Sequence, residues 1–262
     1  MEDTDLRALN GSRGLAVYQI KERCRVLGPG TRAVVWFHGC ALDCPGCIAR
    51  EMNRSDEFFL VTPSDLAARL TRISGIEGVT LTGGDPFDQP RTALLELLTH
   101  IRERSRLSIV CYTGRSLEQL VCGGEAGLNR AILGRIDMLI DGPYRDDLNQ
   151  GHLWRGSSNQ RIWFLTPRYR HLKRELAHAM GRDLEFELSL DGRLSIAGIP
   201  AKGFMEAFAA RLNSRGVELK GVPSPSQGEG QGEGRARTIR ENLPLTPALS
   251  PQGRGGREAS HL

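Results

Sequence analysis

The sequence predicts an α/β fold in which parallel strands alternate with helices. One observation is a series of short segments that are almost continuously apolar, and such segments are expected to be strands buried on both faces. Their residues are 33–39, 78–84, 107–114, 137–143 and 161–165. The other observation is the helical periodicity between them, because a strand, a helix and a further strand in succession make a right-handed crossover in a parallel sheet.

Two segments between the strands begin with helix-start signals. In 62–73, Thr62 is the expected N-cap, Pro63 occupies the first helical position and Asp65 stands three residues after the cap. The segment 89–104, with the sequence QPRTALLELLTHIRER, repeats this arrangement. Both segments are therefore predicted to be amphipathic helices.

After the fifth strand, the sequence predicts three further elements. Residues 167–181 should form a helix, and 184–200 a β-hairpin in which Asp191 and Gly192 provide a tight turn. Residues 202–216 should form a closing amphipathic helix that ends at a C-capping glycine. The predicted fold is thus an α/β sheet with parallel strands, followed by a C-terminal hairpin and helix.

The chain is expected to hold one folded domain, residues 1–220, with an extension that starts at about 166. Residues 221–262 are rich in Gly, Pro, Ser, Gln, Glu and Arg, so they cannot bury enough apolar surface to offset the entropy of ordering. We expect this tail to be disordered. It resembles the translated product of a dispersed intergenic repeat, and the alternative is a flexible partner-binding segment.

Composition and charge exclude several classes of protein. The first twenty residues contain no long apolar run, which argues against a signal peptide, and no later segment approaches the length of a membrane span. A net charge of +4 without a block of like charges gives no reason to expect nucleic acid as a partner. We therefore expect a cytoplasmic protein that binds neither membrane nor nucleic acid.

The residues that directly follow the strands are the candidate ligand-binding residues. In parallel α/β sheets, whether open or closed into a barrel, ligands bind at the carboxyl ends of the strands. Four such turns are rich in glycine and polar residues, namely 38–47, 82–86, 112–116 and 141–147. We expect them to gather at one edge of the sheet.

The first of these turns carries three cysteines with the spacing Cys-x3-Cys-x2-Cys: Cys40, Cys44 and Cys47. Three ligands leave one coordination position vacant, which distinguishes a catalytic metal site from a closed structural one. Thiolates suit iron and sulfide, so a four-iron cluster with one open iron fits the pattern. The alternative is a zinc knuckle that takes His38 as its fourth ligand.

The other three cysteines, Cys24, Cys111 and Cys122, are isolated in the sequence. In a chain of this length without a signal peptide, disulfides are not expected. Each of the three is therefore predicted to be a small buried hydrophobic residue.

The cysteine spacing, placed after a strand, resembles the signature of the radical S-adenosylmethionine enzymes. The segments GPGTRAVVWFHGCALDCPGC and DGPYRDDLNQGHLWRGSSNQRI extend the resemblance to the activating components of glycyl radical enzymes, most closely that of anaerobic ribonucleotide reductase. The match runs from about residue 26 to residue 165. It implies a partial (β/α) barrel, which agrees with the alternation of strands and helices.

The resemblance also implies the chemistry. Cys40, Cys44 and Cys47 would ligate a [4Fe-4S] cluster, and the amino and carboxylate groups of S-adenosylmethionine would chelate the fourth iron. An electron from the reduced cluster would cleave the sulfonium to methionine and a 5'-deoxyadenosyl radical. That radical would abstract a hydrogen atom from the target.

Further residues are assigned to the cofactor by the same resemblance. The GGDP segment looks like the Gly-Gly-Glu-Pro element that presents backbone carbonyls to the amino group of the cofactor, and it comprises Gly83, Gly84, Asp85 and Pro86. The Asp85 carboxylate would add a charged acceptor, and the alternative is an ordinary strand-to-helix turn. Gly46 and Ile48 flank the third cysteine, where the family holds the adenine with backbone atoms.

Two more turns are assigned with alternatives. Tyr112, Thr113 and Gly114 are expected to line the cofactor pocket, or else to form a plain turn. Asp141 is the candidate catalytic residue, in contact with ribose or the incoming target, and its alternative role is N-capping or turn formation. The loop 155–161 is expected to shape the mouth through which the target enters.

The function that follows from the resemblance is activation of a glycyl radical enzyme such as anaerobic ribonucleotide reductase, with flavodoxin or ferredoxin as the reductant. Because residues 166–220 extend beyond the short activators, a radical enzyme that modifies another peptide or a small molecule is an alternative. An iron–sulfur protein without catalysis is a second one. Loss of cofactor binding with an intact cluster in a Gly84→Val variant is expected to exclude the latter.

Overall fold

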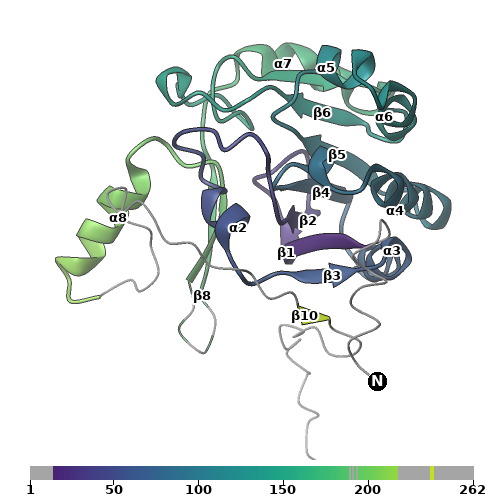
Figure 1. The fold of residues 1–262 in the computed structure, drawn as a ribbon. Coiled ribbons are helices and arrows are strands. Elements are labelled where there is room, and N and C mark those ends of the chain that lie inside the picture. Colours follow the sequence, from purple (N-terminus) through teal and green to yellow (C-terminus); the bar gives the residue numbers. More distant parts are fainter. Residues whose placement is uncertain (1–13, 189, 191, 193, 218–236, 239–262) are drawn as a thin grey trace, which may run out of the picture.

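The computed structural model describes residues 14–188, 190, 192, 194–217 and 237–238. An eight-stranded sheet has the order β10-β3-β1-β2-β4-β5-β6-β7, and β8 and β9 form a separate two-stranded sheet (Figure 1). The strands are β1 (Leu15–Cys24), β2 (Arg32–Phe37), β3 (Phe59–Val61), β4 (Gly78–Gly83), β5 (Ser108–Tyr112), β6 (Met138–Asp141), β7 (Arg161–Phe164), β8 (Leu184–Leu188), β9 (Leu194–Gly198) and β10 (Arg237–Thr238).

The centre of the eight-stranded sheet is parallel, as predicted, because β2, β4, β5 and β6 pair in parallel. The flanks are antiparallel, since β1 pairs antiparallel with β2 and β3, and β7 with β6. The prediction of a parallel strand at 161–165 was therefore wrong. No crossover helix lies between β6 and β7, so the chain returns beside β6 in the opposite direction. The fold is a mixed α/β sheet, and its described strands do not close into a barrel.

The first strand, β1, was not predicted from the sequence. Its pairing with β2 shifts register between Val17 and Gln19 and again between Lys21 and Cys24. Such irregularities change which face each side chain occupies, so the alternation that identifies a half-buried strand is broken.

Helices connect and cover the strands. They are α2 (Arg50–Arg54), α3 (Pro63–Arg72), α4 (Arg91–Arg104), α5 (Leu117–Cys122), α6 (Ala126–Leu133), α7 (Lys173–His178) and α8 (Phe204–Asn213), with 3-10 turns η1 (Pro86–Asp88), η2 (Asp146–Leu148) and η3 (Pro167–Leu172). The start of α3 is confirmed, because the Thr62 hydroxyl accepts a hydrogen bond from the backbone N–H of Asp65 at 3.1 Å.

The start of α4 differs from the prediction. Pro90 occupies the cap position and no side chain caps the helix. The Gln89 side chain is engaged elsewhere, because it accepts from the backbone N–H of Ala16 and donates to the carbonyl of His38, both at 2.8 Å. Gln89 therefore holds His38 at the beginning of the cysteine turn in place and does not cap the helix.

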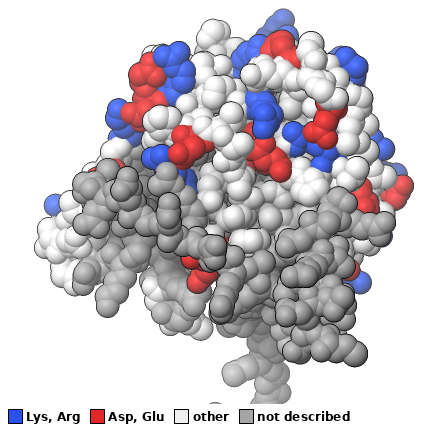
Figure 2. Space-filling model, in the orientation of Figure 1, with Lys and Arg blue, Asp and Glu red and all other residues white. Residues whose placement is uncertain are grey.

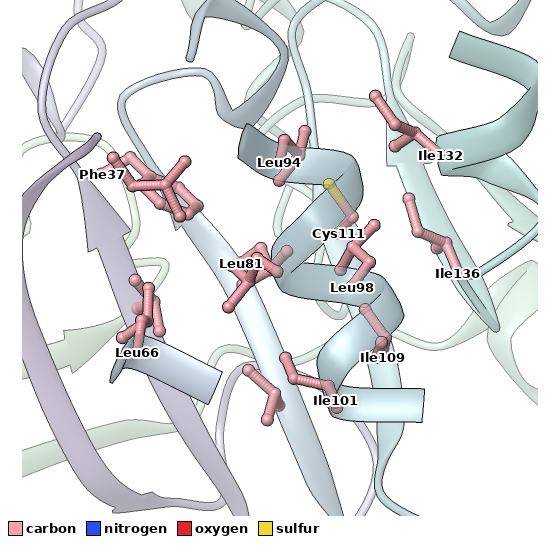
Figure 3. Close-up of a cluster of buried hydrophobic side chains, with 14 of the residues drawn as sticks. Phe37, Leu66, Leu81, Leu94, Leu98, Ile101, Ile109, Cys111, Ile132 and Ile136 are labelled. Atoms are coloured by element: carbon pink, nitrogen blue, oxygen red, sulfur yellow. The ribbon is translucent and has the colours of Figure 1, made fainter. Parts of the chain in front are cut away.

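The main hydrophobic core lies between the sheet and helices α3, α4 and α6. Figure 3 shows Leu94, Leu98 and Ile101 of α4 packed toward Leu81 of β4 and Ile109 of β5. All five side chains are fully buried. Burial of this kind contributes about 1.5–3 kcal/mol for each large aliphatic side chain.

The opposite face of the sheet carries two smaller apolar clusters. One contains Val34 and Trp36 of β2 together with Ala197 of β9. The other contains Val110 of β5, with Tyr112 packed against it. We call this the inner face. Figure 1 shows α8 and β8 on this side of the sheet, away from α3, α4 and α6.

The C-terminal extension, residues 166–217, contains the predicted hairpin and closing helix. The pairing of β8 with β9 runs from Leu184↔Gly198 to Leu188↔Leu194. The α8 helix ends as expected, since Gly216 has a φ of 79° and Val217 donates to the carbonyl of Leu212 at 3.1 Å. The helix predicted at 167–181 is instead the η3 turn followed by the short helix α7.

Some predictions fall on residues outside the described ones. They concern Asp191 in the hairpin turn and nearly all of the tail 221–262, of which only the pair 237–238 is described, in parallel pairing with β3. Among the described residues, no helix combines the length and the apolar composition that crossing a membrane would take. On the described part of the face in Figure 2, acidic and basic side chains are interspersed.

Two of the three isolated cysteines are buried as predicted, namely Cys24 and Cys111. Burial raises the pKa of the Cys24 thiol to about 11. The prediction for Cys122 was wrong, because this residue is exposed at the end of α5.

Candidate functional site

The three clustered cysteines lie on the turn that follows β2, between Phe37 and helix α2. All three are free thiols of intermediate exposure. The turn is closed internally, because Cys47 donates its backbone N–H to the carbonyl of Cys44 at 3.2 Å. Gly46, with a φ of 74°, supplies the left-handed backbone that this short turn needs just before Cys47.

An ion pair links the residues on either side of Cys44 and Cys47. The Arg50 guanidinium donates to both carboxylate oxygens of Asp43, each at 3.0 Å. Asp43 has a φ of 39°, which is uncommon for a residue with a side chain. Arg50 follows Cys47 and Asp43 precedes Cys44, so this bidentate contact brackets two of the three thiols.

The GGDP segment packs directly against the cysteine turn. Asp85 donates its backbone N–H to the carbonyl of Gly39 at 3.0 Å, and Gly84 donates to that of Phe37 at 2.8 Å. A Cβ atom on Gly84 would lie 2.2 Å from the Gly39 carbonyl oxygen, and one on Gly83 would lie 2.8 Å from that of Phe37. Both positions therefore require glycine: Gly84 where the turn after β4 touches Gly39, and Gly83 where it touches Phe37.

The Asp85 carboxylate is buried, and both of its oxygens accept hydrogen bonds from groups of the protein. It accepts hydrogen bonds from the backbone N–H of Phe87 at 2.9 Å, from the Thr113 hydroxyl at 2.9 Å and from the backbone N–H of Gly114 at 3.1 Å. Burial raises the pKa of this carboxyl, although these donors oppose the shift. The contacts show Asp85 joining two turns; Pro86 is likewise buried, in η1.

The turn after β5 also reaches the cysteine turn. A Cβ atom on Gly114 would lie 2.3 Å from Cδ1 of Leu42, which stands between Cys40 and Cys44. Tyr112 lies on the inner face, and its hydroxyl is buried without a hydrogen-bond partner among the described residues. Burial raises the pKa of this phenol. A buried hydroxyl left unpaired costs about 1–3 kcal/mol, which the packing of the inner face must offset.

Two further charged residues support the first cysteine and were not identified from the sequence. The backbone N–H of Ala41, directly after Cys40, donates to the Asp88 carboxylate at 2.7 Å. Asp88 also forms an ion pair with Arg115. The position of Asp88 three residues after Asp85 gives no local signal for this role, because the contact depends on how two turns meet.

Asp141 is placed differently from the other candidates. Its carboxylate is fully buried, accepts from the backbone N–H of Leu117 at 2.7 Å and pairs with Arg161 at 2.6 Å. These contacts anchor the start of α5 and the edge strand β7. They favour the alternative role that the sequence left open for Asp141, which is support of a turn.

The fourth turn approaches the cysteines through another carboxylate. A Cβ atom on Gly46 would lie 3.0 Å from Oδ1 of Asp146, so this side chain rests against the turn beside Cys47. The loop 155–161 holds the fourth turn in place, because Gln160 donates to the carbonyl of Gly142 at 2.9 Å and Asn159 to that of Pro143 at 2.8 Å. All four turns therefore meet, as the sequence predicted.

The donor set of the cysteine turn consists of three thiols, and thiolates suit iron and sulfide. Within the described residues, no group of three His, Cys, Asp or Glu side chains is arranged to hold a metal ion. Burial raises the pKa of the Cys40 and Cys47 thiols, and metal ligation requires that both lose their protons.

The zinc alternative depends on His38, and the structure engages that ring elsewhere. The imidazole stacks on Phe58 with 4.2 Å between ring centroids, and its Nε2 donates to the carbonyl of Ser55 at 3.0 Å. Ile48, on the other side of the cysteine turn, has a side chain that is 53% exposed. An apolar side chain exposed next to Cys47 is consistent with a ligand-facing position.

Comparisons with known proteins agree with this geometry. A family model described as a 4Fe-4S single cluster domain matches residues 26–163. The anaerobic ribonucleoside-triphosphate reductase-activating protein of Enterobacteria phage T4 is 36% identical over 143 residues, which are 53% of this chain and 86% of that protein. Its counterpart in Escherichia coli (strain K12) is 33% identical over 148 residues, 53% of this chain and 92% of that protein.

A comparison of structures finds a weaker likeness. QueE from Escherichia coli superposes with a TM-score of 0.33 and 16% sequence identity, over 55% of this chain and 78% of that one. A superposition of this quality supports no conclusion about fold or function. The C-terminal extension lies outside the region that the family model matches, because that match ends at residue 163.

Proposed function

The chain belongs to the family of anaerobic ribonucleoside-triphosphate reductase-activating proteins, and on this premise we propose that it is a radical S-adenosylmethionine enzyme that installs a glycyl radical on a partner enzyme. The observation that carries the proposal is the meeting of the three-cysteine turn with the GGDP turn. The Gly84 backbone there lies so close to Gly39 that no side chain fits between them.

Cys40, Cys44 and Cys47 are the residues that would hold a [4Fe-4S] cluster. When bound, the cluster supplies the electron that cleaves S-adenosylmethionine, and the resulting radical abstracts hydrogen from a glycine of the target. The protein's part is to present three thiolates on a fixed turn and to leave the fourth coordination position open. Asp43, Arg50 and Asp88 fix the turn through the contacts described above.

Backbone and side chains around the turn would bind the cosubstrate. Gly83 and Gly84 allow the main chain to approach closely, and Gly46 and Ile48 flank Cys47. Asp85 holds Thr113 and Gly114 in register with the GGDP turn. In this proposal Asp85 positions the binding residues, and Asp141 supports α5 and β7 without touching the reacting atoms.

The fold proposed for this function is a partial (β/α) barrel whose parallel part is β2, β4, β5 and β6. Support comes from the gathering of four turns at the carboxyl ends of these strands. Anaerobic ribonucleotide reductase is the proposed partner, a flavodoxin or ferredoxin the proposed reductant, and the cytoplasm the proposed compartment. The relatives' names support the partner, the resemblance in sequence is the basis for the reductant, and the distribution of apolar residues in the sequence is the basis for the compartment.

The proposal is tested by anaerobic reconstitution of the full chain with iron and sulfide. After addition of a strong reductant and S-adenosylmethionine, 5'-deoxyadenosine is measured for the wild type, Cys44→Ala and Cys122→Ala. Cys122 is the matched control because it is an exposed thiol outside the cluster of cysteines. We expect product from the wild type and the Cys122 variant, and a loss of at least 100-fold in Cys44→Ala, roughly the scale of removing an essential catalytic group.

The two alternatives give different results in the same experiment. A protein without catalysis would load the cluster and yield no 5'-deoxyadenosine, even with the target enzyme present. An enzyme that modifies another substrate would cleave the cosubstrate but leave the glycine of the reductase without a radical in EPR spectra. Gly84→Val does not separate these cases, because a side chain there would displace Gly39 beside Cys40 and disturb the cluster itself.

A further inference from the structure

The C-terminal extension, which lies beyond the region matched by the family model, contacts the fourth turn of the site. Lys202, just before α8, forms an ion pair with the Asp146 carboxylate. Oδ1 of the same carboxylate stands 3.0 Å from the position of a Cβ on Gly46. A single side chain therefore separates the extension from the residue that precedes Cys47.

Asp146 is held on its other side by a chain of hydrogen bonds. The Tyr144 hydroxyl donates to Oδ1 of Asp146 at 3.0 Å and accepts from the Asn149 amide at 2.9 Å. The side-chain oxygen Oδ1 of Asn149 in turn accepts from Arg182 of the extension.

Arg182 also binds the loop and the extension to each other. Its guanidinium donates to the backbone carbonyls of Pro200 and, at 3.3 Å, Gly156. The segment from Asp146 to Asn149, which begins in the fourth turn, is thus held by two basic residues of the extension, Lys202 and Arg182.

We propose that Lys202 is a positioning residue of the cysteine turn: through Asp146, it holds the backbone at Gly46 in the conformation that binds S-adenosylmethionine. The inference rests on the proposed function, because it assigns the extension a part in forming that site. Gly46 adopts a φ of 74° and has no side chain to fix it, so its position depends on what packs against it.

The size of the expected effect follows from the exposure of the pair. The side chains of Lys202 and Asp146 are 64% and 35% exposed, so the contact is screened by solvent. Exposed ion pairs contribute modestly, and Lys202→Met is therefore expected to weaken S-adenosylmethionine binding by about two- to fivefold. Lys202→Arg, which keeps the charge, should restore most of the affinity.

The matched control is a second ion pair between the extension and the body, formed by Lys21 of β1 and Glu187 of β8. It joins the same two parts of the chain but does not touch the fourth turn. Lys21→Met should lower the unfolding temperature at least as much as Lys202→Met does, because the Lys21 side chain is only 14% exposed, and it should leave cosubstrate affinity unchanged.

The measurement is a titration of the reconstituted, reduced full-length protein with S-adenosylmethionine, followed by the change in the EPR spectrum of the cluster. Iron content and unfolding temperature are recorded for each variant. The Lys202→Met and Asp146→Asn effects on affinity should not add in the double variant, because both remove the same contact. The difference between wild type and Lys202→Met should shrink at about 1 M salt, where charges are screened within about 3 Å.

Each outcome separates this inference from the proposed function. Equal affinities in wild type, Lys202→Met and Lys21→Met would overturn the inference and leave the function intact, and additive effects of Lys202→Met and Asp146→Asn would overturn it as well. A wild-type protein that loads a cluster but shows no spectral response to S-adenosylmethionine would contradict the proposed function and the inference together.

Discussion

In the sheet body, residues 15–164, apolar side chains fill both faces of the sheet, whereas in the extension β8 directs its glutamates toward the body. Glu185 accepts from the backbone N–H of Arg25 at 2.9 Å, and Glu187 pairs with Lys21. Phe186, between them in the strand, points to the other side and is 47% exposed. Among the described residues of the hairpin and closing helix, Ala197 of β9 is buried in an apolar cluster of the body, whereas Tyr169 and Leu176, earlier in the extension, are buried in the cluster that contains Val110.

The difference shows that the two regions are held by different forces. The body is stabilised by burial of large side chains, which contributes several kilocalories per mole at single positions. The hairpin and α8 contact the body mainly through polar groups, and the aromatic cluster of Phe186, Phe204 and Phe208 packs β8 against α8 within the extension itself. We therefore expect substitutions in the body to affect the whole fold, and those in the hairpin and closing helix to act locally.

The largest effect is expected where two turns of the body are in closest contact. Gly84→Ala places a Cβ 2.2 Å from the Gly39 carbonyl oxygen, so the residues before Cys40 must move. We expect iron loading to fall at least tenfold, which is about the effect on metal affinity of losing a group that orients a metal ligand. Gly127→Ala in α6 is the control, because nothing lies within 4 Å of its Cβ position. That variant should load iron normally and gain up to about 1 kcal/mol in stability.

Two substitutions to alanine, one in the body and one in the extension, test most directly whether different forces hold these regions. Leu97→Ala in α4 removes a fully buried side chain and should lower the free energy of unfolding by about 2–5 kcal/mol. Phe186→Ala removes a half-exposed ring that contacts Phe208 at 5.3 Å between centroids, and its cost should stay below about 1.5 kcal/mol. Urea unfolding followed by circular dichroism measures both; equal losses would contradict the comparison.

A smaller effect on stability separates support from catalysis at Asp141. Asp141→Asn weakens the ion pair with Arg161 and the hydrogen bond from the backbone N–H of Leu117. The free energy of unfolding should therefore fall by about 1–3 kcal/mol. The yield of 5'-deoxyadenosine per folded molecule should remain unchanged. A normal unfolding temperature together with a loss of product would instead restore the catalytic role.

The smallest effect is expected at the exposed pair of Glu118 and Arg161 on the edge of the body. The Arg161 guanidinium lowers the pKa of Glu118 from 4.5 to about 2. Because the folded-state pKa is depressed, the stabilisation is present above about pH 4.5 and is lost as the pH falls toward about 2. The unfolding temperature of Glu118→Gln should thus be slightly below that of the wild type at pH 7, and the difference should narrow at pH 3. A difference independent of pH would show that the charge of Glu118 is not its cause.

The sequence by itself determined the alternation of strands and helices, the parallel centre of the sheet, the hairpin with its closing helix, and the family. It also placed the three cysteines and the GGDP segment at one edge. These features depend on residues that are close together in the sequence. Apolar runs predict strands, Thr62 and Pro63 start a helix, and ligand type and spacing indicate the metal chemistry.

The tertiary structure alone decided the direction of β7, the existence of β1 and the role of each carboxylate. Asp85, Asp88, Asp141 and Asp146 all stand near the ends of strands, yet they support different partners. The partners Gly114, Ala41, Leu117 and Lys202 lie far away in the sequence, so no local pattern distinguishes the four residues. A carboxylate acquires its role from the donors that packing brings to it, and packing is settled by the whole chain rather than by its neighbours in sequence.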